Sequence, residues 1–250
     1  DEAEPRTPTL SLPDRSYLWD GGVIPYLYLP LALTVGLRTS MSPRAAPLLF
    51  DPDEGGARYE GGQYPVAMLY FDAAAAGGLI LLGGDDSVPI PFLAGFADHG
   101  PVWILQIDAH IDWRDEVHGE RYGYSNPMRR ASEMRHVAGI VQVGIRGVGS
   151  ARLTEIEAAR RYGSRFVTAR EVHAQGVEAA LRHIPEGARV VVTLDCDGLD
   201  PGIMPGVAAR SPGGLTYTQV VDLIVGLGRR ARIAGFDLVE LYPPADMDGL

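Results

Sequence analysis

The chain has 250 residues, 46% hydrophobic and 22% charged, an ordinary globular composition that excludes disordered, collagenous and coiled-coil proteins. Its net charge of −10 argues against nucleic acids and anionic membranes as partners, because both would be repelled. All 22 basic residues are arginines, so chemistry that requires a lysine, such as Schiff-base formation, is excluded. We expect one packed domain over residues 1–250.

The cysteine content and the N-terminal segment indicate the compartment. Cys196 is the single cysteine, which excludes an intrachain disulfide and a multi-cysteine metal site. Residues 1–6 are acidic and lack the basic and apolar pattern of a signal peptide. The nearly uncharged run 21–37 contains two prolines and is too short to span a membrane comfortably. We therefore predict a cytoplasmic protein in which this run forms buried strand and loop.

In chain order, apolar runs of strand length alternate with segments of helical spacing after a glycine-rich surface loop at 51–64. The predicted strands are residues 79–82, 102–107, 139–143, 165–168, 189–194 and 233–238. The predicted helices are residues 88–97, 126–134, 151–162, 172–183 and 216–230. Runs that are apolar on both faces are typical of a covered parallel sheet. The alternation predicts an α/β protein, a three-layer α/β/α fold with a mainly parallel central sheet.

Acidic residues gather directly after three of these strands. They are Asp85 and Asp86, then Asp108 and Asp112 with His110 between them, then Asp195, Asp197 and Asp200. Alternation in an extended chain would place Asp108, His110 and Asp112 on one face, and likewise Asp195 and Asp197, with Cys196 pointing away as a small buried residue. Carboxyl ends of parallel strands meet at one edge of the sheet, where functional groups gather.

Five of these carboxylates and the imidazole would converge beside an apolar sheet. So many like charges cannot all stay ionised there without cations between them. An oxygen-rich set with one nitrogen suits Mn²⁺, and less readily Fe²⁺, Co²⁺ or Ni²⁺. The number of ligands favours two ions that share bridging carboxylates.

Four sequence elements occur in the order typical of one enzyme family. They are GGDDS at 83–87, DAHID at 108–112, TLDCDGLDP at 193–201 and GFDLVE at 235–240. In this the chain resembles the ureohydrolases, the family of arginase and agmatinase, and residues 42–44 resemble that family's arginine-rich turn. The resemblance implies a dinuclear manganese site, a homo-oligomer (trimer or hexamer) and hydrolysis of a guanidino group to urea and an amine.

The resemblance also implies a role for each site residue. Asp108 and Asp195 would bridge the ions, Asp86 and Asp112 would complete one coordination shell, and His110 and Asp197 the other. Glu240 would bind the substrate guanidinium through paired N–H bonds. A hydroxide between the ions, oriented by Asp112, would attack the guanidinium carbon.

Two positions depart from the family pattern. Asp86 stands where the family has a histidine ligand, which adds a negative charge to the site. Aligning Pro127 places Tyr124 at the family's proton-shuttle histidine and Asn126 among the substrate-binding residues. A phenol is a poor proton shuttle at neutral pH, so we consider His118 as a substitute.

The resulting prediction is an agmatinase-like hydrolase that converts agmatine to putrescine, with a small cationic guanidino compound as substrate. The acidic pair Asp115 and Glu116, near the expected cleft, favours a cationic substrate tail. Two alternatives remain open. One is hydrolysis of another guanidino compound, such as a guanidino acid or arginine, and the other is a weakly active or non-catalytic paralogue with a structural role.

Overall fold

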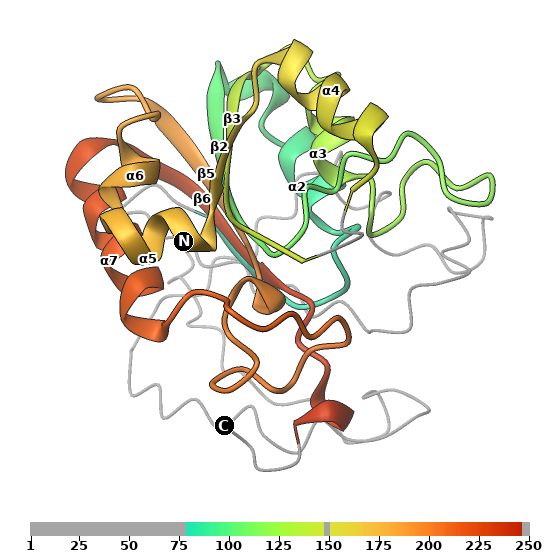
Figure 1. The fold of residues 1–250 in the computed structure, drawn as a ribbon. Helices are drawn as coiled ribbons and strands as arrows, with labels where there is room; N and C mark the ends of the chain where they lie inside the picture. Colours follow the sequence, from blue (N-terminus) through green and yellow to red (C-terminus); the bar gives the residue numbers. More distant parts are fainter. Residues whose placement is uncertain (1–78, 148–150, 247–250) are drawn as a thin grey trace, which may run out of the picture.

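The computed structural model describes residues 79–147 and 151–246 (Figure 1). The segments predicted at 21–37, 42–44 and 51–64 lie outside the described residues. The prediction of a single domain over the whole chain also extends beyond them and stays a prediction.

A sheet of six strands forms the centre of the described part, and each strand is parallel to its neighbours. The strands are β1 Leu79–Leu82, β2 Val102–Ile107, β3 Val137–Ile145, β4 Arg165–Thr168, β5 Arg189–Asp195 and β6 Arg232–Val239. All six predicted strands are confirmed, with β3 and β6 extended at both ends. The parallel sheet follows from the runs of Val, Leu and Ile, which suit strands that are buried on both faces.

Helices follow the strands at the predicted places, although most are shorter than predicted. They are α2 Pro89–Ala94, α3 Pro127–Ala131, α4 Leu153–Tyr162, α5 Ala169–Gln175, α6 Glu178–Leu181 and α7 Tyr217–Arg230, with short 3₁₀ turns η2 Ala97–His99, η3 Cys196–Gly198 and η4 Pro243–Ala245. The single helix predicted at 172–183 is wrong. Gly176 has φ 76°, a positive value that glycine adopts easily, and this turn ends α5 and separates it from α6.

The sheet is covered on both faces, which confirms the three-layer architecture (Figure 1). Leu105 and Ile107 of β2 pack in one apolar cluster with α5, α6 and α7. Val102 and Ile104 of the same strand pack in a second cluster with α2, α3 and α4. Successive side chains of a strand point to opposite faces, so one apolar strand contributes to both cores.

The strand order places a switch point between two neighbouring strands. The order is β1-β6-β5-β2-β3-β4, so the chain leaves β2 toward β3 on one side and leaves β5 toward β6 on the other. The connections therefore separate beyond the carboxyl ends of β2 and β5. In open α/β sheets a crevice at such a point is where ligands bind.

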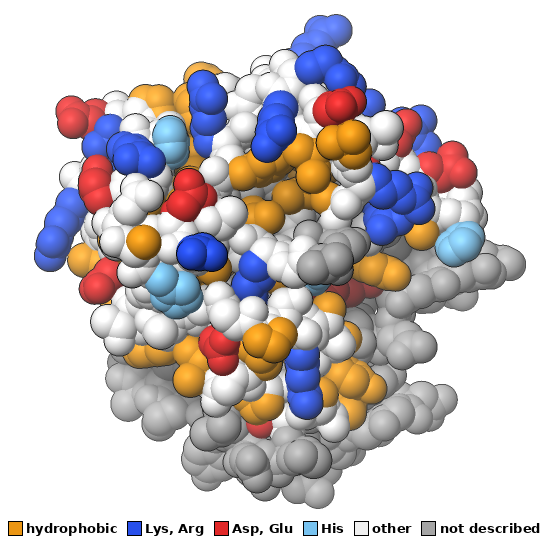
Figure 2. Space-filling model, in the orientation of Figure 1, with side chains coloured by type: hydrophobic (Ala, Val, Ile, Leu, Met, Phe, Trp, Pro, Cys, Tyr) orange, Lys and Arg blue, Asp and Glu red, His pale blue; other side chains and the backbone are white. Residues whose placement is uncertain are grey.

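The visible surface carries both signs of charge. Figure 2 shows arginine and acidic side chains interspersed over this face, without an extended basic area. Within residues 79–147 and 151–246, no helix has the length and apolar character that crossing a bilayer requires.

Candidate metal centre

The loop after β2 brings two carboxylates and an imidazole together. Asp108 is fully buried, Asp112 is buried and His110 is half-buried. The loop turns because the His110 backbone N–H donates to Asp108 Oδ1 at 2.6 Å. The prediction that strand alternation aligns these residues is wrong, because β2 ends at Ile107 and an Asx-type turn produces the convergence.

The loop after β5 repeats this arrangement. The Asp197 backbone N–H donates to Asp195 Oδ1 at 2.7 Å, which starts the 3₁₀ turn η3. Asp197 Oδ1 then accepts the Ala109 backbone N–H at 3.1 Å, so the two loops are tied together. Cys196 lies between the two acids and is 2% exposed, which confirms that it is a small buried residue.

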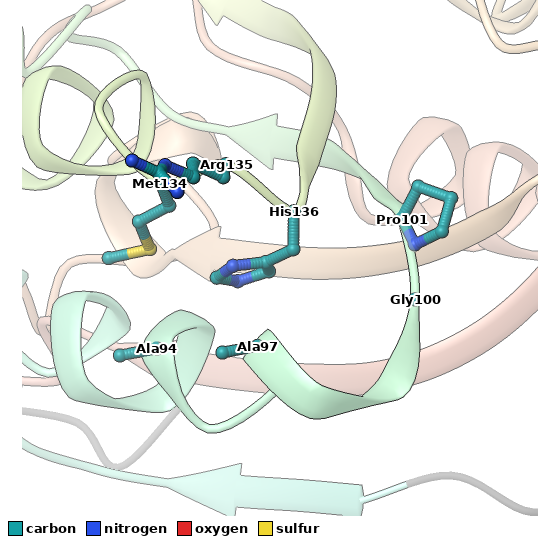
Figure 3. Close-up of a pocket in the computed structure, with 7 residues that line it drawn as sticks. All are labelled: Ala94, Ala97, Gly100, Pro101, Met134, Arg135 and His136. Atoms are coloured by element: carbon teal, nitrogen blue, oxygen red, sulfur yellow. The ribbon is translucent and has the colours of Figure 1, made fainter.

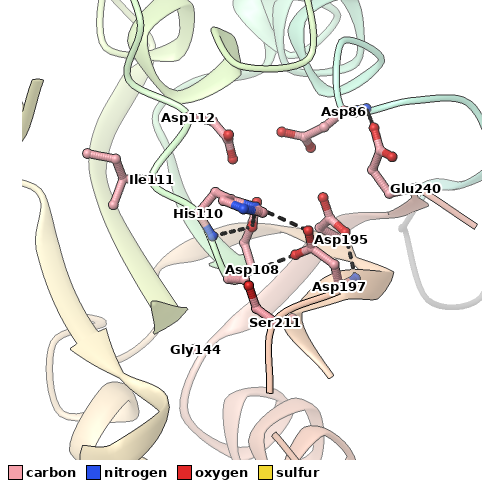
Figure 4. A network of polar contacts seen from close by, with 12 residues as sticks. Asp86, Asp108, His110, Ile111, Asp112, Gly144, Asp195, Asp197, Ser211 and Glu240 are labelled. Carbon is pink, nitrogen blue, oxygen red and sulfur yellow. Dashed lines mark hydrogen bonds and ion pairs between the residues drawn. The ribbon is translucent and has the colours of Figure 1, made fainter. Parts of the chain in front are cut away.

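The other two strands of this half of the sheet add a carboxylate each. Asp86 follows β1, and Glu240 follows β6 directly. The Asp86 backbone N–H donates to Glu240 Oε1 at 2.9 Å, and the Glu240 backbone N–H donates to the carbonyl of Gly84 at 2.9 Å. Four adjacent strands thus direct carboxylates to one edge of the sheet (Figure 4).

Two groups of side chains have the geometry to hold a metal ion. In one, ligand atoms of Asp108, His110 and Asp197 lie within 4.8 Å of one another. In the other, the same limit of 4.8 Å contains ligand atoms of Asp86, Asp108 and Asp112. Asp108 belongs to both groups, which is the position that a bridging ligand occupies.

Asp195 and Glu240 border these groups without belonging to either of them. Figure 4 places Asp195 beside Asp197 and Glu240, with Glu240 on the Asp86 side. The bridging role of Asp195 and the substrate-binding role of Glu240 therefore stay predictions.

The electrostatics of the cluster are those of a cation site. Burial, reinforced by neighbouring carboxylates, raises the pKa of Asp86, Asp108 and Asp195 well above the ordinary value of 3.8. Burial likewise raises the pKa of Glu240 to about 7. The hydrogen bond to Asp197 raises the pKa of His110 to about 9. The carboxyl shifts arise mainly from burial, and repulsion between neighbouring carboxylates adds to them.

Asp86 provides a direct test of whether a metal ion fits this site. Both of its carboxylate oxygens are buried, and neither has a hydrogen-bond partner among the described residues. Asp108 and Asp112, with which it could share an ion, lie within the same 4.8 Å group. A buried carboxylate without donors is costly, and a divalent cation would satisfy both oxygens, so the donor set fits a metal.

Backbone strain concentrates at the predicted site residues. The non-glycine residues with positive φ in the described part are Asp112 at 44°, His118 at 52° and Glu240 at 62°. Such conformations cost about 1–3 kcal/mol each and persist where the surroundings impose them, often at functional sites.

Two glycines, one in β3 and one in η3, let these segments approach the backbone of Asp108. A Cβ at Gly144 would lie 2.9 Å from the Asp108 carbonyl oxygen, and one at Gly198 would lie 2.9 Å from the Asp108 nitrogen. The close packing holds in place the residue that both groups share.

The predicted proton-shuttle and substrate residues lie on the loop that precedes α3. His118 is exposed and Tyr124 is 53% exposed, and neither belongs to a metal-binding group. Asn126 is fully buried, and its amide binds backbone, donating to the Arg114 carbonyl at 2.8 Å and accepting the Gly123 N–H at 3.0 Å. These contacts give Asn126 a structural role, and the catalytic or binding roles of all three residues stay predictions.

Arginine side chains offset the negative charge of Asp115 in the acidic loop. Asp115 forms ion pairs with Arg121, Arg129 and Arg130, and these lower the pKa of its carboxyl group. The argument for a cationic substrate tail is therefore weakened at Asp115, whose charge these arginines offset.

Sequence reasoning missed three polar residues that support the site. Gln106 donates to Asp108 and Asp112, and Gln142 donates to Gln106. Arg146 donates to main-chain oxygens of the η3 region, including the Asp197 carbonyl at 2.6 Å. The sequence did contain a signal for the two glutamines, because each is the single polar residue within an apolar strand run.

A hollow elsewhere on the molecule lacks the residues for this chemistry. Figure 3 shows it before β2 and β3, at the opposite edge of the sheet from the acids. It is lined by Ala94, Ala97, Gly100, Pro101, Met134, Arg135 and His136. The His136 ring nitrogen Nε2 lies 2.8 Å from the Leu93 carbonyl oxygen, so this histidine is held by backbone.

The fold and the site together define a three-layer α/β protein with a carboxylate-rich cation centre at the switch point of a parallel sheet. The family model of the arginase family matches residues 65–249. The chain therefore belongs to the arginase family, as the four sequence elements indicated.

Relatives of known activity cover about two thirds of this chain. N(1)-aminopropylagmatine ureohydrolase of Thermus thermophilus is 38% identical over 168 residues, which are 66% of this chain and 55% of that protein. The mitochondrial guanidino acid hydrolase of Homo sapiens is 34% identical over 187 residues, 72% of this chain and 53% of that protein. The chain thus spans about half the length of these relatives.

A solved structure supports the same assignment. Proclavaminate amidino hydrolase from Streptomyces clavuligerus superposes with a TM-score of 0.62 at 31% identity, covering 69% of this chain and 58% of that one. The similarity confirms the arginase-type three-layer fold for the part of the chain that is compared.

Proposed function

We propose that this protein is a dinuclear-metal amidinohydrolase that releases urea from a small guanidino compound. The observation that carries the proposal is Asp108, which is common to two adjacent groups of metal-ligating side chains. Membership of the arginase family supports it. When bound, two divalent ions supply Lewis-acid chemistry and lower the pKa of water at the site, and we propose Mn²⁺, with Ni²⁺, Co²⁺ or Fe²⁺ as alternatives.

The protein's own residues would hold the ions and the substrate. Asp86, Asp108, His110, Asp112, Asp195 and Asp197 are the proposed metal ligands. Glu240 would bind the guanidinium, because its Oε1 is already fixed by the Asp86 N–H and Oε2 remains to accept substrate N–H groups. Tyr124 or His118 would carry the proton to the leaving amine from the loop before α3.

For the substrate we propose agmatine, with putrescine and urea as products. The support is the similarity to the aminopropylagmatine ureohydrolase, together with the resemblance of the sequence elements to agmatinase. A guanidino acid is the second candidate, because the human guanidino acid hydrolase is similar over 72% of this chain and because arginines offset the charge of Asp115. A cytoplasmic homo-oligomer, trimeric or hexameric, completes the proposal.

A substrate panel separates these possibilities. The 250-residue chain is loaded with Mn²⁺, and urea release is measured with agmatine, aminopropylagmatine, 4-guanidinobutyrate and arginine. The highest kcat/KM with agmatine supports the proposal, and the highest with 4-guanidinobutyrate supports the guanidino acid alternative. Tight binding of two Mn²⁺ without urea from any of them would favour the non-catalytic paralogue.

Replacing Glu240 with glutamine should separate substrate binding from metal binding. Glu240→Gln keeps the shape of the side chain but removes the charge, so kcat/KM should fall by at least about 10-fold, as loss of a charge-assisted hydrogen bond predicts. The Mn²⁺ content should stay near two. Glu178→Gln, at an exposed position on α6, is the matched control and should leave both quantities unchanged. A parallel loss of metal would identify Glu240 as a ligand instead.

Restoring the family's histidine at position 86 should raise activity near neutral pH. Asp86 brings an extra negative charge to the site, which would make the two metal ions less electropositive and less able to lower the pKa of water. We therefore expect slow urea release at pH 7 that increases toward alkaline pH, and a lower optimum in Asp86→His. Tyr124→His should add to this gain. A wild-type rate that is flat around pH 7, or a double variant no faster than the parent, would contradict this expectation.

A further inference from the structure

Two glutamines lie side by side on neighbouring strands in the buried interior of the sheet. Gln106 on β2 is 1% exposed and Gln142 on β3 is 0% exposed, and the strand register pairs them directly. Two residues earlier, on the same face, Ile104 and Ile140 form the equivalent pair. Burying an amide in place of isoleucine lowers the stability of the fold unless the amide makes its hydrogen bonds. The two glutamines therefore require an explanation.

The glutamines belong to a chain of hydrogen bonds that runs in one direction. The Ser164 hydroxyl donates to Gln142 Oε1 at 2.8 Å, and Gln142 Nε2 donates to Gln106 Oε1 at 2.5 Å. Gln106 Nε2 then donates to Asp108 Oδ2 at 2.6 Å and to Asp112 Oδ2 at 2.7 Å. Each of these four hydrogen bonds has its donor on the side away from the carboxylates, and hydrogen bonds aligned in this way polarise one another.

Gln106 fixes the two carboxylates relative to each other. Its amide has two N–H groups, and each of them holds one oxygen of Asp108 or Asp112. A carboxylate oxygen has two lone pairs, so one hydrogen bond leaves it able to bind a cation. Since an amide does not titrate, the NH₂ group of Gln106 can donate to the two carboxylates at every pH.

Gln142 fixes the orientation of Gln106. A flipped Gln106 would turn its oxygen toward two carboxylates and its NH₂ toward the NH₂ of Gln142. Gln142 cannot flip in response, because its Nε2 also donates to the Ile111 carbonyl at 2.8 Å and its Oε1 accepts the Ser164 hydroxyl. Ser164 itself is 5% exposed, so water does not compete freely for this bond.

We infer that Gln142 and Ser164 are positioning residues for the metal centre, which act through Gln106 on the carboxylates of Asp108 and Asp112. This inference rests on the proposed function, because it requires that the carboxylates bind metal. Partners that orient metal ligands commonly change metal affinity by about 10- to 100-fold when they are removed.

The test is the Mn²⁺ affinity of the metal-free 250-residue chain, measured by calorimetric titration with Mn²⁺ alone. Gln142→Leu, which touches no proposed ligand, should weaken the affinity by about 10-fold. Ser164→Ala should weaken it less and in the same direction. Ile140→Val, on the same face of β3, is the matched control and should lose stability without changing the affinity.

A double-mutant cycle tests whether Gln142 acts through Gln106. Once Gln106→Leu has removed the donor, adding Gln142→Leu should weaken Mn²⁺ binding no further, because the chain is already interrupted. Additive losses would overturn the inference, as would an unchanged affinity in Gln142→Leu or, if that variant does not fold, in Ser164→Ala. A wild-type chain that binds no Mn²⁺ would overturn the proposed function and this inference with it, whereas normal wild-type binding with unaffected variants would overturn the inference alone.

Discussion

Asp108→Ala is expected to abolish most of the stabilisation that Mn²⁺ gives to this protein. Asp108 is the one residue present in both metal-binding groups, so its loss should affect both ions. The affinity should fall by more than the roughly 100-fold that loss of a ligand's hydrogen-bond partner can cause. At a metal concentration 100 times the wild-type Kd, the wild-type chain gains about 2.7 kcal/mol of stability for each bound ion, most of which the variant should lose.

Thermal unfolding with and without Mn²⁺ measures this effect, and elemental analysis gives the metal content. In chelator the variant should not show this loss of stability relative to wild type. Without a cation, the buried Asp108 carboxylate repels its neighbours and does not stabilise the fold. Asp222→Asn, an exposed acid on α7, is the control and should respond to Mn²⁺ as wild type does. An Asp108→Ala variant that retains two ions would refute the bridging role.

The metal-free protein is expected to become less stable as the pH rises from 5 to 9. Burial raises the pKa of Glu240 to about 7 and that of Asp237 to about 8, from ordinary values of 4.5 and 3.8. The folded protein therefore holds these protons more tightly than the unfolded chain. The stabilisation is complete below the ordinary values and is lost as the pH rises through 7 and 8.

His110 acts in the same direction. Its pKa is raised from 6.5 to about 9, so its contribution is complete below pH 6.5 and disappears as the pH rises through 9. Each 1 kcal/mol lost lowers Tm by about 2–4 °C in a chain of this size, so the metal-free Tm should fall by several degrees.

Added Mn²⁺ should reverse this trend, because the ions displace protons from the ligands and bind more tightly at higher pH. Thermal melts in chelator and in Mn²⁺ at pH 5, 7 and 9 give the measurement. Asp237→Asn should reduce the slope near pH 8, whereas Asp222→Asn should not change it. A metal-free Tm that is flat or rises over this range would show that these buried groups do not bind protons more tightly in the folded protein than in the unfolded chain.

The sequence predicted the parts of this protein that depend on local pattern. Apolar runs such as 79–82 and 165–168 are the observed strands β1 and β4 to the residue. Short motifs carried the family resemblance, because metal ligands must be of particular residue types at fixed spacing. The helix predicted at 172–183 failed because spacing alone does not reveal that the chain turns at Gly176 with a positive φ.

Only the tertiary structure decided how those residues act together. The sequence placed Asp108 and Asp112 on one strand face, but a loop beyond β2 and the donors of Gln106 bring them together. The charge of Asp115 looked available in the sequence, but arginines up to 15 residues away pair with it. The neighbour of Gln106 is Gln142, 36 residues away. Residue type and spacing determine which chemistry is possible, whereas orientation and charge depend on partners distant in the chain, which only the packed sheet brings into contact.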